Sequence, residues 1–133
     1  MKVMALDFGT ARTGVAVSDP TGTIARPIGV ISDATSRVGR TRLIELVDQE
    51  DVELIVVGMP LTLRGARGDQ AKATEAFVDE LRKAVAIPVE TYDERFTTTL
   101  AQRTPSDRDV PEDARAAAHL LSSYLEWSSV GRE

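Results

Sequence analysis

The stretch Leu6–Asp19, LDFGTARTGVAVSD, places a carboxylate at the end of one apolar strand and leads through a short glycine-bearing connection into a second. Side chains alternate between the two faces of a strand, so Val3, Ala5 and Asp7 share one face. A charge that continues an apolar row is costly unless it meets a cation, hydrogen-bond donors or water. Asp7 is therefore either a site residue at a strand end or an acid that caps the turn, and this stretch alone favours neither.

Three strands are expected at the start of the chain, at residues 2–8, 13–18 and 25–31. The short connection Gly9–Arg12 suits an antiparallel hairpin. The second strand is apolar on both faces, which indicates an interior position in the sheet. Asp19–Gly22 (DPTG) predicts a turn. Pro27 favours a sheet edge for the third strand, because a missing amide donor is tolerated there.

The rest of the chain alternates helical and strand patterns. The expected elements are a helix at 37–50 capped by Ser36, a buried strand at 53–57, a helix at 70–85 capped by Asp69, a strand at 87–92 and a last helix that opens at Pro111. Residues 97–109 are expected to form a short helical turn and then a mobile loop. Strand–helix–strand units of this kind indicate an α/β fold with parallel pairing in its second half.

Composition limits the possible classes of protein. Residues 1–133 most simply form one domain, and the absence of cysteine excludes a disulfide framework or a thiolate metal site. No stretch resembles a targeting segment or an apolar membrane span of about 18 residues, so we expect a soluble, cytoplasmic protein.

The charge balance leaves the partner open. A net charge of −5 argues weakly against a broad basic surface for nucleic acid. Only three of the 16 basic residues are lysines, however, and arginine binds phosphate and carboxylate equally well. Arg64 and Arg67 follow the strand at 53–57, where α/β sheets place their sites, and they either grip phosphate or simply face solvent.

Three acids stand out as candidate metal ligands. Asp7 ends the first strand, Glu94 follows the last, and Asp113 lies on the apolar stripe of the final helix. Asp113 could instead only complement the helix dipole. If the strands that carry Asp7 and Glu94 are neighbours, the carboxylates converge where the helix crosses. Mg²⁺ prefers such ligands, and two ions can promote phosphodiester cleavage. The only histidine, His119, is expected at the surface or its boundary.

Four segments taken together resemble the YqgF family, also called the RuvX or Holliday junction resolvase-like family. They are LDFGTARTGVAVSD, VVGMPLTLRGARGDQA, YDERFTT and EDARAAAHLLSSYL, in the family's order. The resemblance implies an RNase H-like fold, with a five-stranded mixed sheet that begins with three antiparallel strands and is flanked by helices. It also implies a metal-dependent nuclease that matures the 5′ end of 16S rRNA or, in the older description, resolves four-way DNA junctions.

The resemblance also implies roles for particular residues. Asp7, Glu94 and Asp113 would be the catalytic ligands of Mg²⁺ or Mn²⁺. Contacts to a precursor rRNA or branched DNA would come from Arg12, Arg64, Arg67 and Arg95, and ribosomal particles are possible partners of a monomer or homodimer. The chain departs from the family at Thr62 and Arg64-Gly65, where an Asn and an Asp-Gly are usual, and in a short acidic segment before Asp113.

Two other classes of function remain open. The DFGT motif also resembles the phosphate loop of the actin and sugar-kinase superfamily, although this chain has no room for the second lobe that closes over ATP. The acidic balance and scarce lysines also suit a ribosome-associated binding module without catalysis, because electrostatics usually dominates affinity for nucleic acid.

Overall fold

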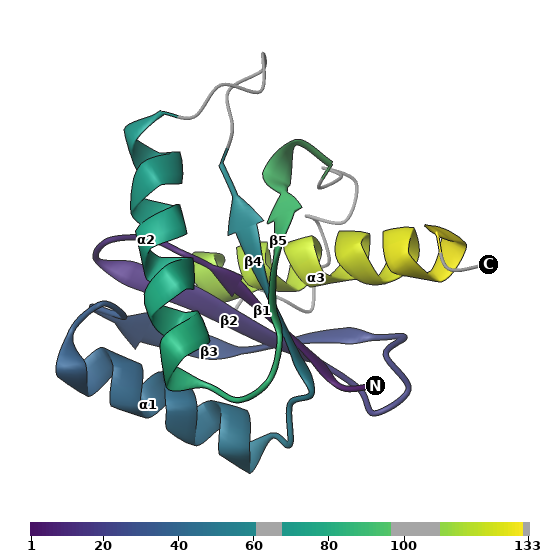
Figure 1. Ribbon diagram of the computed structural model, residues 1–133. Helices are drawn as coiled ribbons and strands as arrows, with labels where there is room; N and C mark the ends of the chain where they lie inside the picture. Colours follow the sequence, from purple (N-terminus) through teal and green to yellow (C-terminus); the bar gives the residue numbers. More distant parts are fainter. Residues whose placement is uncertain (61–67, 97–109, 132–133) are drawn as a thin grey trace.

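The computed structural model describes residues 1–60, 68–96 and 110–131 (Figure 1). The elements in these ranges are β1 (Val3–Asp7), β2 (Arg12–Ser18), β3 (Ala25–Ser32), α1 (Arg37–Gln49), β4 (Leu54–Met59), α2 (Asp69–Ala84), β5 (Val89–Asp93), the 3₁₀ turn η1 (Glu94–Phe96) and α3 (Glu112–Gly131). Every strand and helix that the sequence predicts is present within a few residues of its expected bounds. The prediction for residues 97–109 lies outside the described residues.

The five strands form one mixed sheet in the order β3-β2-β1-β4-β5. The pairs β1–β2 and β2–β3 are antiparallel, whereas β4 is parallel to both β1 and β5. Short connections can only return a strand antiparallel, while the helical crossovers through α1 and α2 bring the next strand back in parallel. The interior place of β2 and the edge place of β3 are both confirmed.

Helices cover both faces of the sheet. On one face Met4 and Leu6 pack in a cluster with residues of α1 and α2, and on the other Val3 and Ala5 pack in a cluster with α3 (Figure 1). This alternation confirms the expected face pattern of β1. Asp7 has the same parity as Val3 and Ala5, so its side chain belongs to the α3 face.

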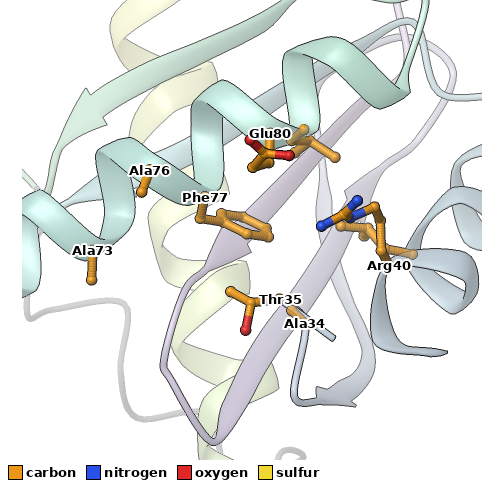
Figure 2. Close-up of a pocket in the computed structure, with 9 residues that line it drawn as sticks. Ala34, Thr35, Arg40, Ala73, Ala76, Phe77 and Glu80 are labelled. Atoms are coloured by element: carbon orange, nitrogen blue, oxygen red, sulfur yellow. The ribbon is translucent and has the colours of Figure 1, made fainter. Parts of the chain in front are cut away.

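An apolar pocket of about 230 Å³ lies between α1 and α2. In Figure 2 the ring of Phe77 projects from α2 into this pocket, and Arg40 and Glu80 lie at its margins. The pocket is therefore on the face of the sheet opposite α3, and it is separate from the acid at the end of β1. No helix in the described ranges is long and apolar enough to cross a membrane.

The helix caps were predicted with mixed success. Ser36 caps α1 as expected, since its hydroxyl accepts a hydrogen bond from the amide of Gly39 at 3.0 Å. The predicted cap of α2, Asp69, is wrong: Gly68 occupies the cap position and Asp69 is the first helical residue. An acid in the first turn still complements the positive end of the helix dipole, so the residue type suits either position.

The prediction for His119 is wrong as well, because its side chain is only 7% exposed. Helix α3 crosses several strands of the sheet. The sheet therefore buries a wider stripe of α3 than the row of apolar residues in the sequence indicates. Ser123 lies in the same stripe and is also buried.

Gly14 allows the start of α3 to rest on β2. A Cβ atom at this position would lie only 1.8 Å from the carbonyl oxygen of Asp113 and 3.0 Å from the amide nitrogen of Ala114. Both neighbours belong to the backbone, which cannot rotate away as a side chain could. The absence of a side chain at Gly14 therefore fixes where Asp113 enters the structure.

We expect Gly14→Ala to lower the free energy of unfolding by about 1–3 kcal/mol, because the helix start must move away from the sheet. Urea unfolding measures this change. The matched control is Gly68→Ala, where a Cβ would meet no atom of the described residues within 4 Å and the backbone has negative φ, so a change within about 1 kcal/mol is expected. Equal losses in the two variants would show that the close approach at Gly14 does not constrain α3.

Candidate active site

From the sequence, Asp7 and Glu94 were expected to converge if the strands that carry them are neighbours. In the structure these two strands are not neighbours. Asp7 ends β1 and Glu94 follows β5, and β4 lies between these strands. The parallel register pairs Leu6 with Val57 and Gly58 with Tyr92. The residue of β4 between the two acids is therefore Gly58.

The side chain of Glu94 occupies the space above Gly58. A Cβ atom on Gly58 would lie 2.7 Å from Oε1 and 2.9 Å from Cγ of Glu94, and 3.0 Å from Cδ2 of Leu120. The carboxyl groups of Glu94 and Asp7 face each other closely enough for a proton on Glu94 to be shared with Asp7. The two acids thus meet across β4, and they can do so only because β4 has no side chain at that point.

Burial raises the pKa of both acids. For Glu94, burial, the charge of Asp7 and their shared hydrogen bond raise the pKa to about 7. For Asp7, burial raises the pKa, the hydrogen bond with Glu94 opposes this rise, and the charge of Asp113 adds to it. Two carboxylates this close disfavour simultaneous ionisation, so the pair attracts a proton or a metal cation.

Asp113 completes the set of predicted acids from the first turn of α3. Its Oδ2 atom lies 3.3 Å from Nε of Arg12, at the start of β2. Both side chains are partly exposed, and an ion pair in contact with water contributes little to stability. The ion pair matters for position instead, because it keeps the side chain of Arg12 close to the acids.

The other predicted arginines have different outcomes. Arg95 is bound by its neighbour Asp93, with Nε 2.9 Å and Nη2 2.5 Å from Oδ2, and this contact holds the pKa of Asp93 below its usual range. Arg64 and Arg67 lie outside the described residues. The structure therefore places Arg12 and Arg95 beside the acids, each in contact with a carboxylate.

The donor chemistry suits a hard divalent cation. Carboxylate oxygens are the protein ligands that Mg²⁺ prefers, and Mg²⁺ often uses only one or two of them while it keeps several waters. Asp7 and Glu94 already form such a pair. Across the described ranges, no three acidic or histidine side chains stand in an arrangement that would hold a metal ion together. Asp113 would become a third ligand only if its side chain turned away from Arg12.

Comparison with known proteins identifies the family. The RuvX family model, described as Holliday junction resolvase, matches residues 1–127. A protein of Roseiflexus sp. (strain RS-1) is 43% identical over 132 residues, with 94% of each chain covered, and one of Syntrophomonas wolfei is 34% identical over 140 residues, covering 100% of this chain and 99% of its own. Both are named "Putative pre-16S rRNA nuclease".

The chain belongs to the RuvX family. Its fold is RNase H-like, as expected from the resemblance. Thermus thermophilus RuvC, solved in complex with a Holliday junction substrate, superposes with a TM-score of 0.68 at 17% identity, covering 98% of this chain and 96% of RuvC. RuvX is a family of nucleases, and divalent-metal dependence is general for nucleases of this fold.

Two contributors to the site were missed from the sequence. Gly58 interrupts a buried apolar strand, and an isolated glycine in a strand often marks the close approach of another group. That signal was present in LIVVGM but was not used. Asp93 ends β5 and binds Arg95, although its sequence pattern does not single it out. Its role depends on local geometry that spacing does not show.

We expect Gly58→Ala to weaken Mn²⁺ binding by about 10- to 100-fold, because the new Cβ displaces Glu94 from Asp7. Isothermal titration calorimetry measures the affinity. The groups that must move are side chains, so the fold should survive with a loss of about 1–3 kcal/mol. Gly68→Ala again serves as the control, and unchanged Mn²⁺ affinity in Gly58→Ala would contradict the positioning role.

The raised pKa of Glu94 predicts a pH dependence of stability without metal. An acid whose pKa rises from 4.5 to about 7 on folding stabilises the protein below about pH 4.5, and this contribution is lost as the pH rises through about 7. We therefore expect wild type in chelator to lose stability between pH 5 and pH 8 relative to Glu94→Gln. Urea unfolding at the two pH values tests this. Parallel changes in both proteins would contradict it.

Proposed function

We propose that this protein is a Mg²⁺- or Mn²⁺-dependent endonuclease that processes the 5′ end of the 16S rRNA precursor. The observation that carries the proposal is the Asp7–Glu94 pair, two half-buried carboxylates that face each other across Gly58 with Asp113 nearby. The relatives named as pre-16S rRNA nucleases support the choice of substrate.

Each acid would take part in holding the metal. Asp7 and Glu94 would bind through their paired oxygens, and Asp113 would join them from α3. A divalent cation in such a site supplies a Lewis acid for the phosphodiester and a nucleophilic water. Rigid elements carry two of the three acids, since Asp7 ends a central strand and Asp113 lies in a long helix.

Arg12 would hold a phosphate of the substrate close to the acids. Its guanidinium group lies beside Asp113 and is largely exposed, so a phosphate oxygen can reach it from solvent. Arginine forms paired hydrogen bonds with phosphate as it does with carboxylate. The ion pair with Asp113 keeps Arg12 at the site until a substrate phosphate takes over the contact.

A four-way DNA junction is the second candidate substrate. The family description and the likeness to RuvC favour it. Symmetric resolution of a junction needs two cuts related by a two-fold axis, which a homodimer supplies and a monomer does not. The oligomeric state in solution therefore discriminates between the two substrates.

The non-catalytic module predicts binding to ribosomal particles without cleavage in any divalent metal.

We expect Asp7→Asn to reduce metal-dependent cleavage by roughly 100-fold or more, because loss of a ligand removes several kcal/mol of transition-state stabilisation. The assay compares a 16S precursor fragment with a four-way junction in Mg²⁺, in Mn²⁺ and in chelator. The raised pKa of Asp7 shows that its charge is unfavourable in the fold, so Asp7→Asn should be at least as stable as wild type.

The matched control is Asp48→Asn, the same chemical change on the exposed side of α1, which should leave cleavage unchanged. Full activity in Asp7→Asn, or wild-type cleavage that persists in chelator, would refute the proposed metal site. Cleavage of the junction alone would replace the RNA substrate with DNA.

A further inference from the structure

Two aromatic side chains, one in η1 and one in α3, are largely exposed. Phe96 is 59% exposed and Trp127 is 56% exposed, yet each contacts the buried ring of Tyr92, with ring centroids 6.0 Å and 5.9 Å apart. We refer to Phe96, Trp127 and the underlying Tyr92 as the aromatic patch. It joins β5 and η1 to α3.

Packing explains the inner part of the patch but not its outer rings. Tyr92 and Tyr124 are buried edge to face, with centroids 5.7 Å apart, and the hydroxyl of Tyr124 donates to Oε2 of Glu90 at 2.9 Å. Phe96 and Trp127 rest on these two tyrosines and keep more than half of their surface exposed. Rings held in place on one side and open to solvent on the other are suited to stack with a planar ligand.

The patch continues directly from the acid site. Phe96 lies in the same 3₁₀ turn as Glu94, two residues further along. Leu120 lies next to Glu94 above Gly58, and Trp127 follows Leu120 by seven residues, or about 10 Å along α3. Stacked nucleotides follow one another at about 3.4 Å. If the phosphodiester that is cut lies at Asp7 and Glu94, the nearest bases of that nucleic-acid strand therefore come within reach of both rings.

We propose that Phe96 and Trp127 form a stacking platform for unpaired bases of the nucleic acid that is cut at Asp7 and Glu94. This inference rests on the proposed nuclease function and adds to it a binding mode. Single-stranded nucleic acid commonly binds through bases stacked on aromatic side chains, without sequence preference. Stacking also suits a protein with a net charge of −5, because contact with the face of a base does not depend on attraction to phosphate.

The area and charge of the patch favour a base over a protein partner. Aromatic side chains bury about 150–250 Å² each, so the exposed parts of two rings offer roughly 200–300 Å². A stable protein interface needs about 800 Å² on each partner. Burial raises the pKa of Tyr92, and the nearby charges of Asp93 and Glu126 raise it further, so the patch has acidic neighbours that weaken its attraction for phosphate. The uncharged face of a base avoids this repulsion.

Trp127 reports on the patch directly, because it is the only tryptophan in the chain. The experiment adds a ten-nucleotide oligo(U), and separately oligo(dT), to wild-type protein in chelator, so that no strand is cut. We expect quenching of Trp127 fluorescence by both single strands and little quenching by a duplex. The affinity should depend only weakly on salt, since few counterions are released.

Variants separate stacking from general apolar contact. With a fluorescently labelled oligo(U), Phe96→Ala and Phe96→Leu should each weaken binding by about 5- to 150-fold, the equivalent of 1–3 kcal/mol per stacked base. Phe96→Tyr and Trp127→Phe should bind nearly as wild type. Val38→Ala removes part of an apolar side chain on α1 that is more exposed than either ring, and it should leave oligo(U) binding unchanged.

The outcomes distinguish this inference from the proposed function. If wild type cuts its substrate but Phe96→Leu and Trp127→Ala bind oligo(U) unchanged, the platform is wrong and the nuclease stands. Weakened binding in both variants, with no cleavage by wild type in any metal, supports the platform and refutes the nuclease. If the two variants lose association with ribosomal particles but still bind oligo(U) as wild type does, the platform is wrong and the patch is a protein-contacting surface.

Discussion

The contact between Asp7 and Glu94 across Gly58 is the constraint on which the rest of the site depends. The strand order β3-β2-β1-β4-β5 puts one whole strand between the two acids, so an ordinary side chain on β4 would keep them apart. Gly58 removes that obstacle while the backbone of β4 still pairs with both neighbours. The sheet can therefore keep its hydrogen bonds and still bring two carboxylates together above its surface.

The third acid depends on a second omission of the same kind. Gly14 pairs with Asp7 in the antiparallel ladder, and its missing side chain lets the first turn of α3 approach β2. The two glycines thus lie on either side of β1, on the strands that flank Asp7. Backbone atoms that touch leave little freedom, and a site built on a strand and a helix is held more precisely than one built on loops. The cost is that a side chain at either position would displace the groups that pack against the glycine.

The sequence predicted the elements well because their signals are local. Alternation and helical periodicity need only a few neighbouring residues, and short connections determine antiparallel pairing. Strand order is not local, so β1 and β5 could be taken for neighbours although β4 separates them. His119 was misplaced for a similar reason, since its burial depends on how α3 crosses the sheet. The structure does place the three acids near one another, since Glu94 and Asp113 both act on Asp7, but the part played by Gly58 required the parallel register.

The electrostatics of the site explain how an acidic protein can admit a phosphate at all. Arg12 and Arg95 each contact a carboxylate, Asp113 and Asp93 respectively, so a phosphate must compete with an acid for either arginine. Such an exchange is favourable only when the released carboxylate gains another counter-charge. A divalent cation held by Asp7 and Glu94 would supply that charge if Asp113 joined them, and Arg12 would then be free to bind a phosphate. Binding of metal and binding of a phosphate would then favour one another, which ties substrate affinity to the presence of the metal.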